Sequence, residues 1–373
     1  MKIVIGGDVV PTEASRECFA KKDFLQFFDD NFRKLWTGAD LRLFNLECPV
    51  IDNGKAKPIA KSGPNLYCSE ECINGIKSLN PDLICLANNH ILDYGQIGLR
   101  HTQKLLAEAK IASTGIVEKK DGTPEVFYFS RDGIKVGVYN ICETEYCNAT
   151  NVSAGADAYE ENYTCSVITG LKNKCDFLIV IFHAGKEFYR YPSPKLQNRC
   201  RAFVDAGADF VTCQHSHCIG CEERYGRGRI LYGQGNFLFD SGNDEFWNYG
   251  LLVQLNVEKD NFSVKYILLE KSSPVAKIVV DDKIMDEFRV RSMKIKDREF
   301  VEMEYGRFAN RLLDEYLKIL YPRTFFERVY KKIRGKYPKR NLSEKYYLDV
   351  LNSIRCEAHS EVLIRGLEDK IGK

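Results

Sequence analysis

The segment FLIVIFHAGKEF, residues 177–188, joins an uninterrupted apolar run to a histidine. A short continuous apolar run is typical of a strand that is buried on both faces, as in a parallel sheet. The run ends at His183, so its imidazole is predicted to lie where the strand ends. The same pattern recurs at residues 3–5 before Asp8, 41–46 before Glu47, 82–86 before Asn88-Asn89-His90, and 210–213 before His215 and His217.

Segments with helical apolar spacing separate these strands. Such spacing is present in residues 24–36, 72–79, 97–110 and 196–206. Further strand-like runs lie at residues 126–129, 135–141, 229–232, 251–257 and 264–269. Strands that alternate with helices predict an α/β sandwich in which the central strands are mainly parallel.

The composition of the chain changes at about residue 281. Beyond it, the sequence is charged and shows helical apolar spacing. We therefore predict an α/β domain over residues 1–280 and a charged, helical C-terminal extension over residues 281–373. Part of the extension, residues 321–341, is rich in basic and aromatic residues: Tyr321, Arg323, Phe325, Phe326, Arg328, Tyr330, Lys331, Lys332, Arg334, Lys336, Tyr337, Lys339 and Arg340.

This basic and aromatic segment has two interpretations. It could bind an anionic membrane surface or an acidic polymer, or it could be a solvated helix face whose charge is balanced by acids nearby. The second is favoured because 54 basic and 52 acidic residues leave a net charge of only +2 and little long-range attraction. The same balance argues against a nucleic-acid partner.

The overall composition is that of an ordinary globular protein, with 44% hydrophobic and 28% charged residues among 373. No window of ~18 uninterrupted apolar residues is present, so no transmembrane segment is expected. The apolar run at the N-terminus is too short for a signal-peptide core. Without an export signal, the 14 cysteines are expected to be reduced thiols and the protein cytoplasmic.

Histidine is scarce, and four of the six histidines come just after predicted strands: His90, His183, His215 and His217. The carboxyl ends of parallel strands lie along one edge of a sheet, and ligands bind outside that edge. We therefore expect these imidazoles to meet Asp8 and Glu47. Carboxylates, imidazoles and an amide without a thiolate suit Mn²⁺, Fe or Zn²⁺. Glu47 could bridge two ions ~3.5–4 Å apart, as in two-metal hydrolytic sites.

Each of these residues alone has a simpler interpretation. A single histidine after a strand is more often hydrogen-bonded than bound to a metal, and that interpretation is kept for His101 and His359. Asp8 could cap a loop, and Glu47 could be an exposed carboxylate. The coincidence of such groups at five strand ends is what favours a metal or phosphate site.

The segments around these residues resemble the poly-gamma-glutamate capsule-synthesis (CapA-like) family, a branch of the calcineurin-like metallophosphoesterases. They follow in the expected order over residues 1–240: Gly7-Asp8-Val9, Asn45-Leu46-Glu47-Cys48-Pro49, Ala87-Asn88-Asn89-His90 with Asp93 and Gly95, His183-Ala184-Gly185-Lys186-Glu187-Phe188 with Pro192, Gln214-His215-Ser216-His217, and Tyr232-Gly233-Gln234-Gly235-Asn236-Phe237. The resemblance implies a four-layered α/β/β/α fold with a metal centre at the strand ends.

The resemblance also implies a set of metal ligands. Asp8 and His217 would hold one ion, Glu47 would bridge, and the second ion would be completed by Asn89, His183 and His215. The sequence departs from the superfamily pattern at Val10, where a histidine is usual, and at Glu47, where an aspartate is usual. One ion therefore keeps few protein ligands, and the site is expected to hold one or two divalent ions of Mn, Fe, Zn or Mg.

The remaining matching residues would serve catalysis and substrate binding. His90 would act as a general acid or phosphate donor held by Asp93. Glu187 and Asn236 would line the pocket or orient ligands. In or beside the matching segments, cations that could meet a phosphate or a polyglutamate carboxylate are Lys61, Lys186 and Arg190.

Other motifs give weaker signals. Cys218-x-x-Cys221 could be a zinc or redox pair, but no second pair follows, and buried or incidental thiols are the favoured interpretation. The sequence has no GxxxxGK[ST] loop and no GxGxxG after a strand, so ATP or dinucleotide use has no local support.

The sequence therefore predicts a metal-dependent hydrolase acting on a phosphoester, linked to capsule or poly-gamma-glutamate synthesis. The substrate would be a phosphorylated small molecule or an anionic polymer, and other capsule-synthesis proteins would be partners. One alternative is a non-hydrolytic, metal-dependent binding component of polyglutamate assembly. Another is a scaffold that has kept a structural metal, which the loss of the usual histidine at Val10 permits.

Overall fold

The computed structural model describes residues 1–52, 54–120, 122–240, 245–272, 274–320, 324–335 and 343–372. They form two compact units. The first comprises Met1–Ile59 and Asn65–Val301, and the second comprises Ala60–Pro64 and Glu302–Lys373. The first unit contains every strand of the described residues, and the second is helical.

The first sheet of the larger unit has a parallel core with an antiparallel flank. Its order is β18-β17-β16-β1-β2-β5-β6, and β15 pairs with the end of β1. β1, β2, β5 and β6 run parallel, whereas β16, β17 and β18 are joined by antiparallel pairing. The strands are β1 (Lys2–Val10), β2 (Leu41–Leu46), β5 (Leu83–Cys85), β6 (Ala112–Thr114), β15 (Asn236–Phe239), β16 (Tyr249–Val257), β17 (Phe262–Ser272) and β18 (Val275–Ile278).

The second sheet is built in the same way. Its order is β13-β14-β12-β11-β9-β8, with β9, β11, β12 and β14 parallel and antiparallel strands at both edges. The strands are β8 (Phe127–Arg131), β9 (Ile134–Cys142), β11 (Phe177–His183), β12 (Phe210–Gln214), β13 (Ile219–Tyr225) and β14 (Gly228–Gln234). Two short ribbons accompany the sheets: β3 (Val50–Ile51) with β4 (Cys68–Ser69), and β7 (Ile116–Val117) with β10 (Gly155–Ala156).

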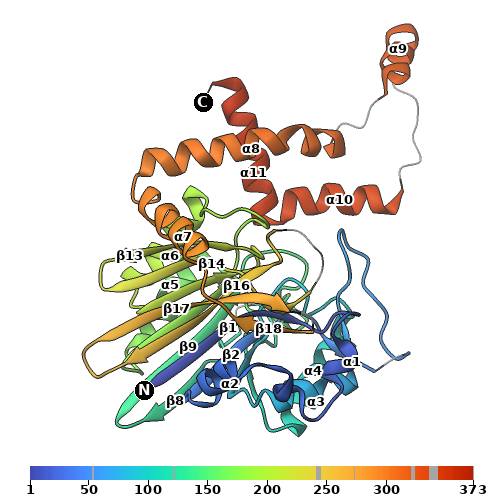
Figure 1. Cartoon of the computed structure of the whole chain (residues 1–373). Helices are drawn as coiled ribbons and strands as arrows, with labels where there is room; N and C mark the ends of the chain where they lie inside the picture. The colour runs from blue at the N-terminus through green and yellow to red at the C-terminus, as the bar shows by residue number, and fades with distance from the viewer. Residues whose placement is uncertain are drawn as a thin grey trace. The chain divides into compact units, whose positions relative to one another are not determined.

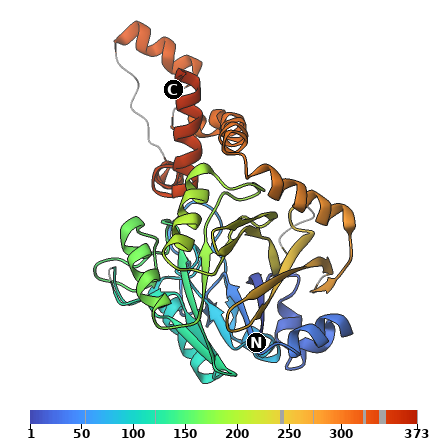
Figure 2. The same ribbon diagram turned by 90° about the vertical axis from the view of Figure 1, so that its left-hand side faces the viewer.

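Helices cover the outer face of each sheet, as Figures 1 and 2 show. Phe32 and Leu99 belong to the core between the first sheet and its helices, and Ile168 and Phe203 to the core between the second sheet and its own. The helices are α1 (Arg16–Phe19), α2 (Asp30–Thr37), α3 (Ile73–Ser78) and α4 (Gly95–Glu108) on the first sheet, and α5 (Glu161–Lys172) and α6 (Pro194–Asp205) on the second.

A third core lies between the two sheets. Ile5 and Leu43 of the first sheet pack in one cluster with Val138 and Ile179 of the second. Because strand side chains alternate between faces, each sheet buries one set of residues against the other sheet and the opposite set against helices. The predicted four-layered α/β/β/α fold is confirmed.

Buried amides tie the two sheets together at the carboxyl ends of their parallel strands. Gln214, which ends β12, donates from Nε2 to the carbonyl of Gly6 in β1 at 3.1 Å. Gln234, which ends β14, donates to the carbonyl of Ile5 at 2.8 Å. Asn140 of β9 accepts a hydrogen bond from the backbone N–H of Ala87 at 2.8 Å. The ends of both sheets are thereby held at the same rim.

Two glycines in β1 allow β15 to pair closely beside it. A Cβ atom on Gly7 would lie 2.1 Å from the carbonyl oxygen of Gly235, which no real contact permits. The register of β1 against both neighbours shifts near this point, between Ile5 and Val9. The predicted strand stops at Ile5, but β1 continues to Val10, because the glycines allow pairing on both sides.

The helix predicted over residues 24–36 is present only in its second half. Residues Phe24–Phe27 form a short 3₁₀ helix, η1, and α2 begins at Asp30. The carboxylate of Asp29 accepts a hydrogen bond from the backbone N–H of Phe32 at 2.7 Å, which starts a new helix and interrupts the expected one. A second 3₁₀ turn, η2 (Glu70–Cys72), precedes α3.

Helix α7 (Asp282–Lys294) follows the point where the composition changes, yet it packs on the first unit. The guanidinium of Arg291 donates from Nε to the carbonyl of Gly220 in β13 at 2.8 Å. The division into domains at residue 281 remains a prediction.

The second unit is formed by the remaining helices. These are α8 (Arg298–Leu320), which starts in the first unit, α9 (Phe325–Arg334), α10 (Glu344–Arg355) and α11 (Glu357–Ile371). Arg365 of α11 binds the carboxylate of Glu302 in α8 at 2.6 Å. Of the basic segment 321–341, residues 321–323 and 336–341 lie outside the described residues. No helix among the described residues has the length and apolar character needed to cross a membrane.

Replacing Gly7 with alanine should destabilise the first unit, because the new methyl group would meet the backbone of Gly235. We expect a loss of about 2–4 kcal/mol in the free energy of unfolding, measured in urea. The matched control is Gly170→Ala at an exposed position of α5, where nothing lies within 4 Å of the added carbon. It should be stabilising by about 0.5–1 kcal/mol. Equal effects of the two substitutions would contradict the close approach of β15.

Candidate metal centre

Two groups of three buried side chains meet at the rim where the parallel strands end. One group is Asp8, Glu47 and His217, and the other is Glu47, His183 and His215. Within each group the ligand atoms all lie within 4.8 Å of one another. Glu47 belongs to both groups. Side chains from β1, from β11, and from the turns after β2 and β12 are thus brought together from positions 8 to 217.

The first group is organised around the carboxylate of Asp8. Its Oδ1 accepts a hydrogen bond from Nδ2 of Asn45 at 2.8 Å, and its Oδ2 accepts one from the backbone N–H of His215 at 3.1 Å. Nδ1 of His217 lies 3.8 Å from Oδ2 of Asp8 and 3.0 Å from Oδ1 of Asn236. These contacts fix the carboxylate and imidazole before any ion is bound.

The second group is organised around His183. Its Nε2 lies 3.2 Å from Oε1 of Glu47 and 3.0 Å from Oδ1 of Asn89. Atoms about 3 Å apart are spaced as neighbouring ligands of one divalent ion with bonds of about 2.1 Å. The ring of His215 lies beside that of His183, with 4.9 Å between their centroids. Asn89, predicted as a ligand, therefore lies with this group.

The buried oxygen and nitrogen atoms of the two groups are suited to a cation. Both carboxylate oxygens of Glu47 are buried and accept no hydrogen bond, and Nδ1 of His215 is also buried without a hydrogen-bond partner. A buried carboxylate without hydrogen bonds is costly unless a positive charge compensates it. The oxygen and nitrogen donors suit a divalent ion.

The backbone at this rim is strained. His215 and His217 have φ angles of 89° and 54°, in a region that residues other than glycine rarely occupy. Such strain persists only where the surrounding structure enforces it, and it gathers at functional sites. The two conformations turn both imidazoles to the same cluster of carboxylates.

Burial and neighbouring charges shift the pKa values of the site. Burial, together with the charge of Glu47, raises the pKa of Asp8 to about 6. Burial also raises the pKa of Glu47 and lowers that of His183 to about 4. For His217, burial favours the neutral ring, but the carboxylates of Glu47 and Asp8 outweigh it and raise the pKa.

His90 lies next to this cluster and is held by Asp93. Nδ1 of His90 is 2.6 Å from Oδ2 of Asp93, which also accepts a hydrogen bond from the backbone N–H of Leu66 at 2.6 Å. The charge of His90 acts on Glu47, lowering the pKa of that carboxyl against the effect of burial. The structure thus brings the predicted His90–Asp93 pair to the site.

The residues predicted to bind substrate are placed differently from one another. Lys186 lies 3.8 Å from the carboxylate of Glu187, and the charge of Glu187 acts on Glu47. Arg190 instead bonds to the carbonyl of Ile219 and lies over the ring of Phe246. Lys61 belongs to the second compact unit.

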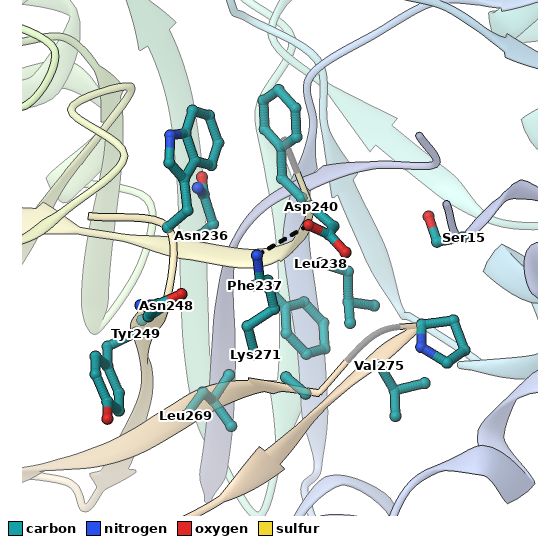
Figure 3. A pocket seen from close by; sticks show the side chains of 15 residues that line it. Ser15, Asn236, Phe237, Leu238, Asp240, Asn248, Tyr249, Leu269, Lys271 and Val275 are labelled. Carbon is teal, nitrogen blue, oxygen red and sulfur yellow. Dashed lines mark hydrogen bonds and ion pairs between the residues drawn. The ribbon is translucent and has the colours of Figure 1, made fainter. Parts of the chain in front are cut away.

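Asn236 contacts His217 and also lines a pocket shown in Figure 3. In that pocket Lys271 reaches Oδ1 of Asp240 at 3.0 Å, so its charge is already paired. No member of the two metal-capable groups lines this pocket. We therefore place the candidate site at the rim.

Several residues at the site were not predicted from the sequence. Asn45 holds Asp8, and Nδ2 of Asn88 donates to Oδ1 of Asn45 at 3.0 Å. Glu143, buried just after β9, has Oε1 3.9 Å from Nε2 of His215. Trp247 stacks on His217 with 4.8 Å between centroids. Glu143 follows a predicted strand and could have been found by the strand-end rule, whereas no pattern marks Trp247.

The buried Cys218 and Cys221 belong to neither metal-capable group of the described residues. Cys221 packs in the core between the second sheet and its helices. This placement agrees with the interpretation of these two cysteines as buried thiols.

Comparison with known proteins identifies the family of this chain. Residues 2–241 match the family described as "Bacterial capsule synthesis protein PGA_cap". The chain belongs to this family. The matched region contains every residue of the two metal-capable groups and ends before the helices α7–α11.

The individual relatives share less than a third of their aligned residues with this chain. The chain is 29% identical over 196 residues to "Capsule biosynthesis protein CapA" of Bacillus anthracis, covering 50% of this chain and 47% of that protein. It is 26% identical over 286 residues to "PGA biosynthesis protein CapA" of Bacillus subtilis (strain 168), covering 74% of this chain and 73% of the relative. The chain thus spans about half the length of the Bacillus anthracis protein.

The solved structures with some similarity to this chain include a putative 5'-nucleotidase from Staphylococcus aureus, which shares 18% identity with a TM-score of 0.44. The similarity covers 77% of this chain and 57% of that one. A hypothetical protein from Thermus thermophilus shares 12% identity with a TM-score of 0.47, covering 73% of this chain and 100% of that one.

Replacing Glu47 with glutamine should separate stability from metal binding. In the metal-free protein, loss of a buried charge without hydrogen bonds should raise the free energy of unfolding by about 1–3 kcal/mol. Addition of Mn²⁺ or Zn²⁺ should raise the Tm of the wild type and should not raise that of the variant. Thermal unfolding with and without chelator measures both effects.

Glu223→Gln is the matched control for this substitution. Glu223 is also buried, but it accepts hydrogen bonds from Arg201 at 2.6 Å and from Tyr232 at 2.9 Å. This substitution should destabilise the protein and leave the metal-induced rise in Tm unchanged. A Glu47→Gln protein with the full metal-induced rise would contradict the central position of Glu47.

Metal affinity should rise with pH. A cation needs Asp8 ionised and His217 neutral, and their raised pKa values, about 6 for Asp8, mean that binding displaces protons below and near neutrality. Affinity should increase about tenfold per pH unit for each proton displaced. His183, with a pKa lowered to about 4, should contribute nothing to this slope above pH ~5. Calorimetric titration between pH 5 and 8 measures the slope, and a flat profile would contradict the assignment.

Proposed function

We propose that this protein is a metal-dependent hydrolase that acts on a phosphoester and takes part in the synthesis of capsule or poly-gamma-glutamate polymer. The observation that supports this most strongly is the buried carboxylate of Glu47, which accepts no hydrogen bond and is shared by two groups of ligands. Family membership supports the link to capsule synthesis.

The ligand arrangement suits one or two divalent ions of Mn, Fe, Zn or Mg. In our proposal Asp8 and His217 hold one ion, Glu47 bridges, and Asn89, His183 and His215 hold the other. Such ions, when bound, lower the pKa of water and neutralise negative charge on a phosphoryl oxygen. Asn45, through its hydrogen bond to Asp8, orients the carboxylate for this task.

His90 is proposed as the general acid. Asp93 holds Nδ1 of the ring at 2.6 Å, which fixes the ring's orientation. We propose that Nε2 of His90 gives its proton to the leaving oxygen of the substrate. The pair is shielded from bulk water, since His90 is 8% exposed and Asp93 is fully buried.

Lys186 is proposed to receive the anionic substrate. Its side chain is only 11% exposed. Burial lowers the pKa of His215, and the charge of Lys186 adds to that effect, which supports a position of the ammonium group near the site. A cation in a partly buried position stabilises phosphate oxygens better than an exposed one, because water screens it less. It would serve a polyglutamate carboxylate equally well.

A non-hydrolytic binding component of polymer assembly is the second candidate. One observation favours it: Val10, in the place where superfamily members usually carry a histidine, is buried in the core against the helices and supplies no ligand. An ion held by fewer protein ligands binds more weakly and leaves more positions for substrate oxygens.

His90→Asn should lower kcat for aryl or nucleotide phosphoesters by about 10²–10⁴, the usual contribution of a general acid. Asp93→Asn should lower it less, because the imidazole remains. Metal content, measured by elemental analysis, should stay at the wild-type value in both variants. The matched control is His101→Asn, since His101 pairs with Glu70 instead of Asp93 and should keep full activity.

Activity must be assayed with Mn²⁺, Mg²⁺, Zn²⁺ and Fe²⁺ in turn. No turnover of any phosphoester with any of these metals would contradict the hydrolase. Metal-dependent retention of polyglutamate without hydrolysis would then support the binding component instead.

A further inference from the structure

Helix α9 in the second unit is encoded by local sequence signals. At its start, the hydroxyl of Thr324 accepts a hydrogen bond from the backbone N–H of Glu327 at 3.4 Å. The carboxylate of Glu327 in turn accepts one from the backbone N–H of Thr324 at 2.8 Å. This reciprocal arrangement is a capping box, which favours a helix start at this point.

The helix carries an apolar stripe that faces solvent. Phe326, Val329, Tyr330 and Ile333 are spaced as i, i+3, i+4 and i+7, which places them on one face. Phe326 is 81% exposed and Ile333 is 74% exposed. Val329 and Tyr330 are 38% and 42% exposed. All four side chains are therefore accessible to solvent, Phe326 and Ile333 most of all.

An exposed stripe of this kind on a short helix is unfavourable in water. A 10-residue helix is marginal by itself, because most helical stability in proteins comes from burying an amphipathic face. Large apolar side chains that occur singly on a surface need no explanation, but a continuous stripe marks an interaction site. The capping box and the stripe together indicate a helix prepared to bury this face against another surface.

The charge of the surrounding sequence identifies the kind of surface. Residues 321–341 contain eight basic residues and a single acidic one, Glu327. Lys332 and Arg334, both exposed, adjoin Ile333 in sequence and therefore project from other sides of the helix. An apolar face bordered by basic residues matches the boundary between acyl chains and anionic headgroups of a bilayer.

We propose that α9 binds in the plane of an anionic lipid membrane, with the stripe of Phe326, Val329, Tyr330 and Ile333 facing the acyl chains and the basic residues contacting the headgroups. An acidic polymer would satisfy the basic residues alone and would leave the stripe exposed. The near-zero net charge of the whole chain does not oppose this binding, because screening over about 10 Å makes the local charge decisive.

The test is cosedimentation of the full chain with lipid vesicles. The protein should bind vesicles of phosphatidylcholine with about 30% phosphatidylglycerol and should bind pure phosphatidylcholine much more weakly. Ile333→Asp should weaken binding to the anionic vesicles at least tenfold. Lys332→Glu combined with Arg334→Glu should weaken it more strongly, by about fivefold for each charge removed and further for each charge reversed.

Ile364→Asp is the matched control, because Ile364 is an exposed isoleucine of α11, 54% accessible, outside the stripe. It should bind vesicles as the wild type does. Circular dichroism and metal content would verify that each variant is folded. Equal binding of the Ile333→Asp and wild-type proteins, or no preference for anionic vesicles, would overturn the proposal. Binding to soluble polyglutamate that Ile333→Asp leaves intact, without vesicle binding, would assign the segment to an acidic polymer instead.

Discussion

Parallel pairing in two facing sheets is the constraint on which the candidate site depends. β1 pairs with β2 and β2 with β5, while β11 lies between β9 and β12, so the carboxyl ends of these strands share one rim. Antiparallel pairing of any of them would send its polar end to the opposite edge. The amides of Gln214 and Gln234 then hold the two sheets in register at that rim. Residues far apart in sequence meet because parallel pairing brings the carboxyl ends of their strands to the same rim.

The site is costly to the folded chain in the absence of an ion. Glu47 is buried without hydrogen bonds, Asp8 has a pKa raised to about 6, and His215 and His217 have strained backbones. None of these features serves the stability of the metal-free protein. Their concentration at one rim, inside a tightly packed core, is what a binding site for a cation requires. Stability given up at one place in this way is common at functional sites.

Much of the fold could be predicted because it depends on long apolar runs. The strand at residues 41–46 coincides with β2, and residues 177–182 with all but the last residue of β11, since continuous apolar segments signal buried strands. The helix over residues 24–36 was wrong in its first half, because the capping side chain of Asp29 overrides apolar spacing. The predicted end of the first strand, at Ile5, was wrong because the close packing of Gly7 against Gly235 that extends β1 is a tertiary effect.

The candidate site could be predicted only in part, for a related reason. Asp8, His183 and His215 are marked because they follow apolar runs in the sequence, whereas Asn45 lies within such a run, in β2, and shows its role only through its contact with Asp8. Trp247 lies outside the described strands and helices, and no sequence rule connects it with His217. Patterns along one strand predict which groups reach the rim. They do not predict the neighbours that orient those groups, because those neighbours come from other strands and loops.

The position of Val10 bears on how many ions such a rim can hold. β1 passes through a change of register at Asp8, and Val10 beyond it is buried among apolar side chains of the helical layer. A histidine there would have to leave that core to reach the carboxylate of Asp8. The first group therefore offers three side chains that could hold an ion, whereas Asn89 would add a fourth to the second. If affinity follows the number of ligands, an ion at the proposed site of His183 and His215 would be held more tightly, and one at His217 would keep more positions open to substrate oxygens.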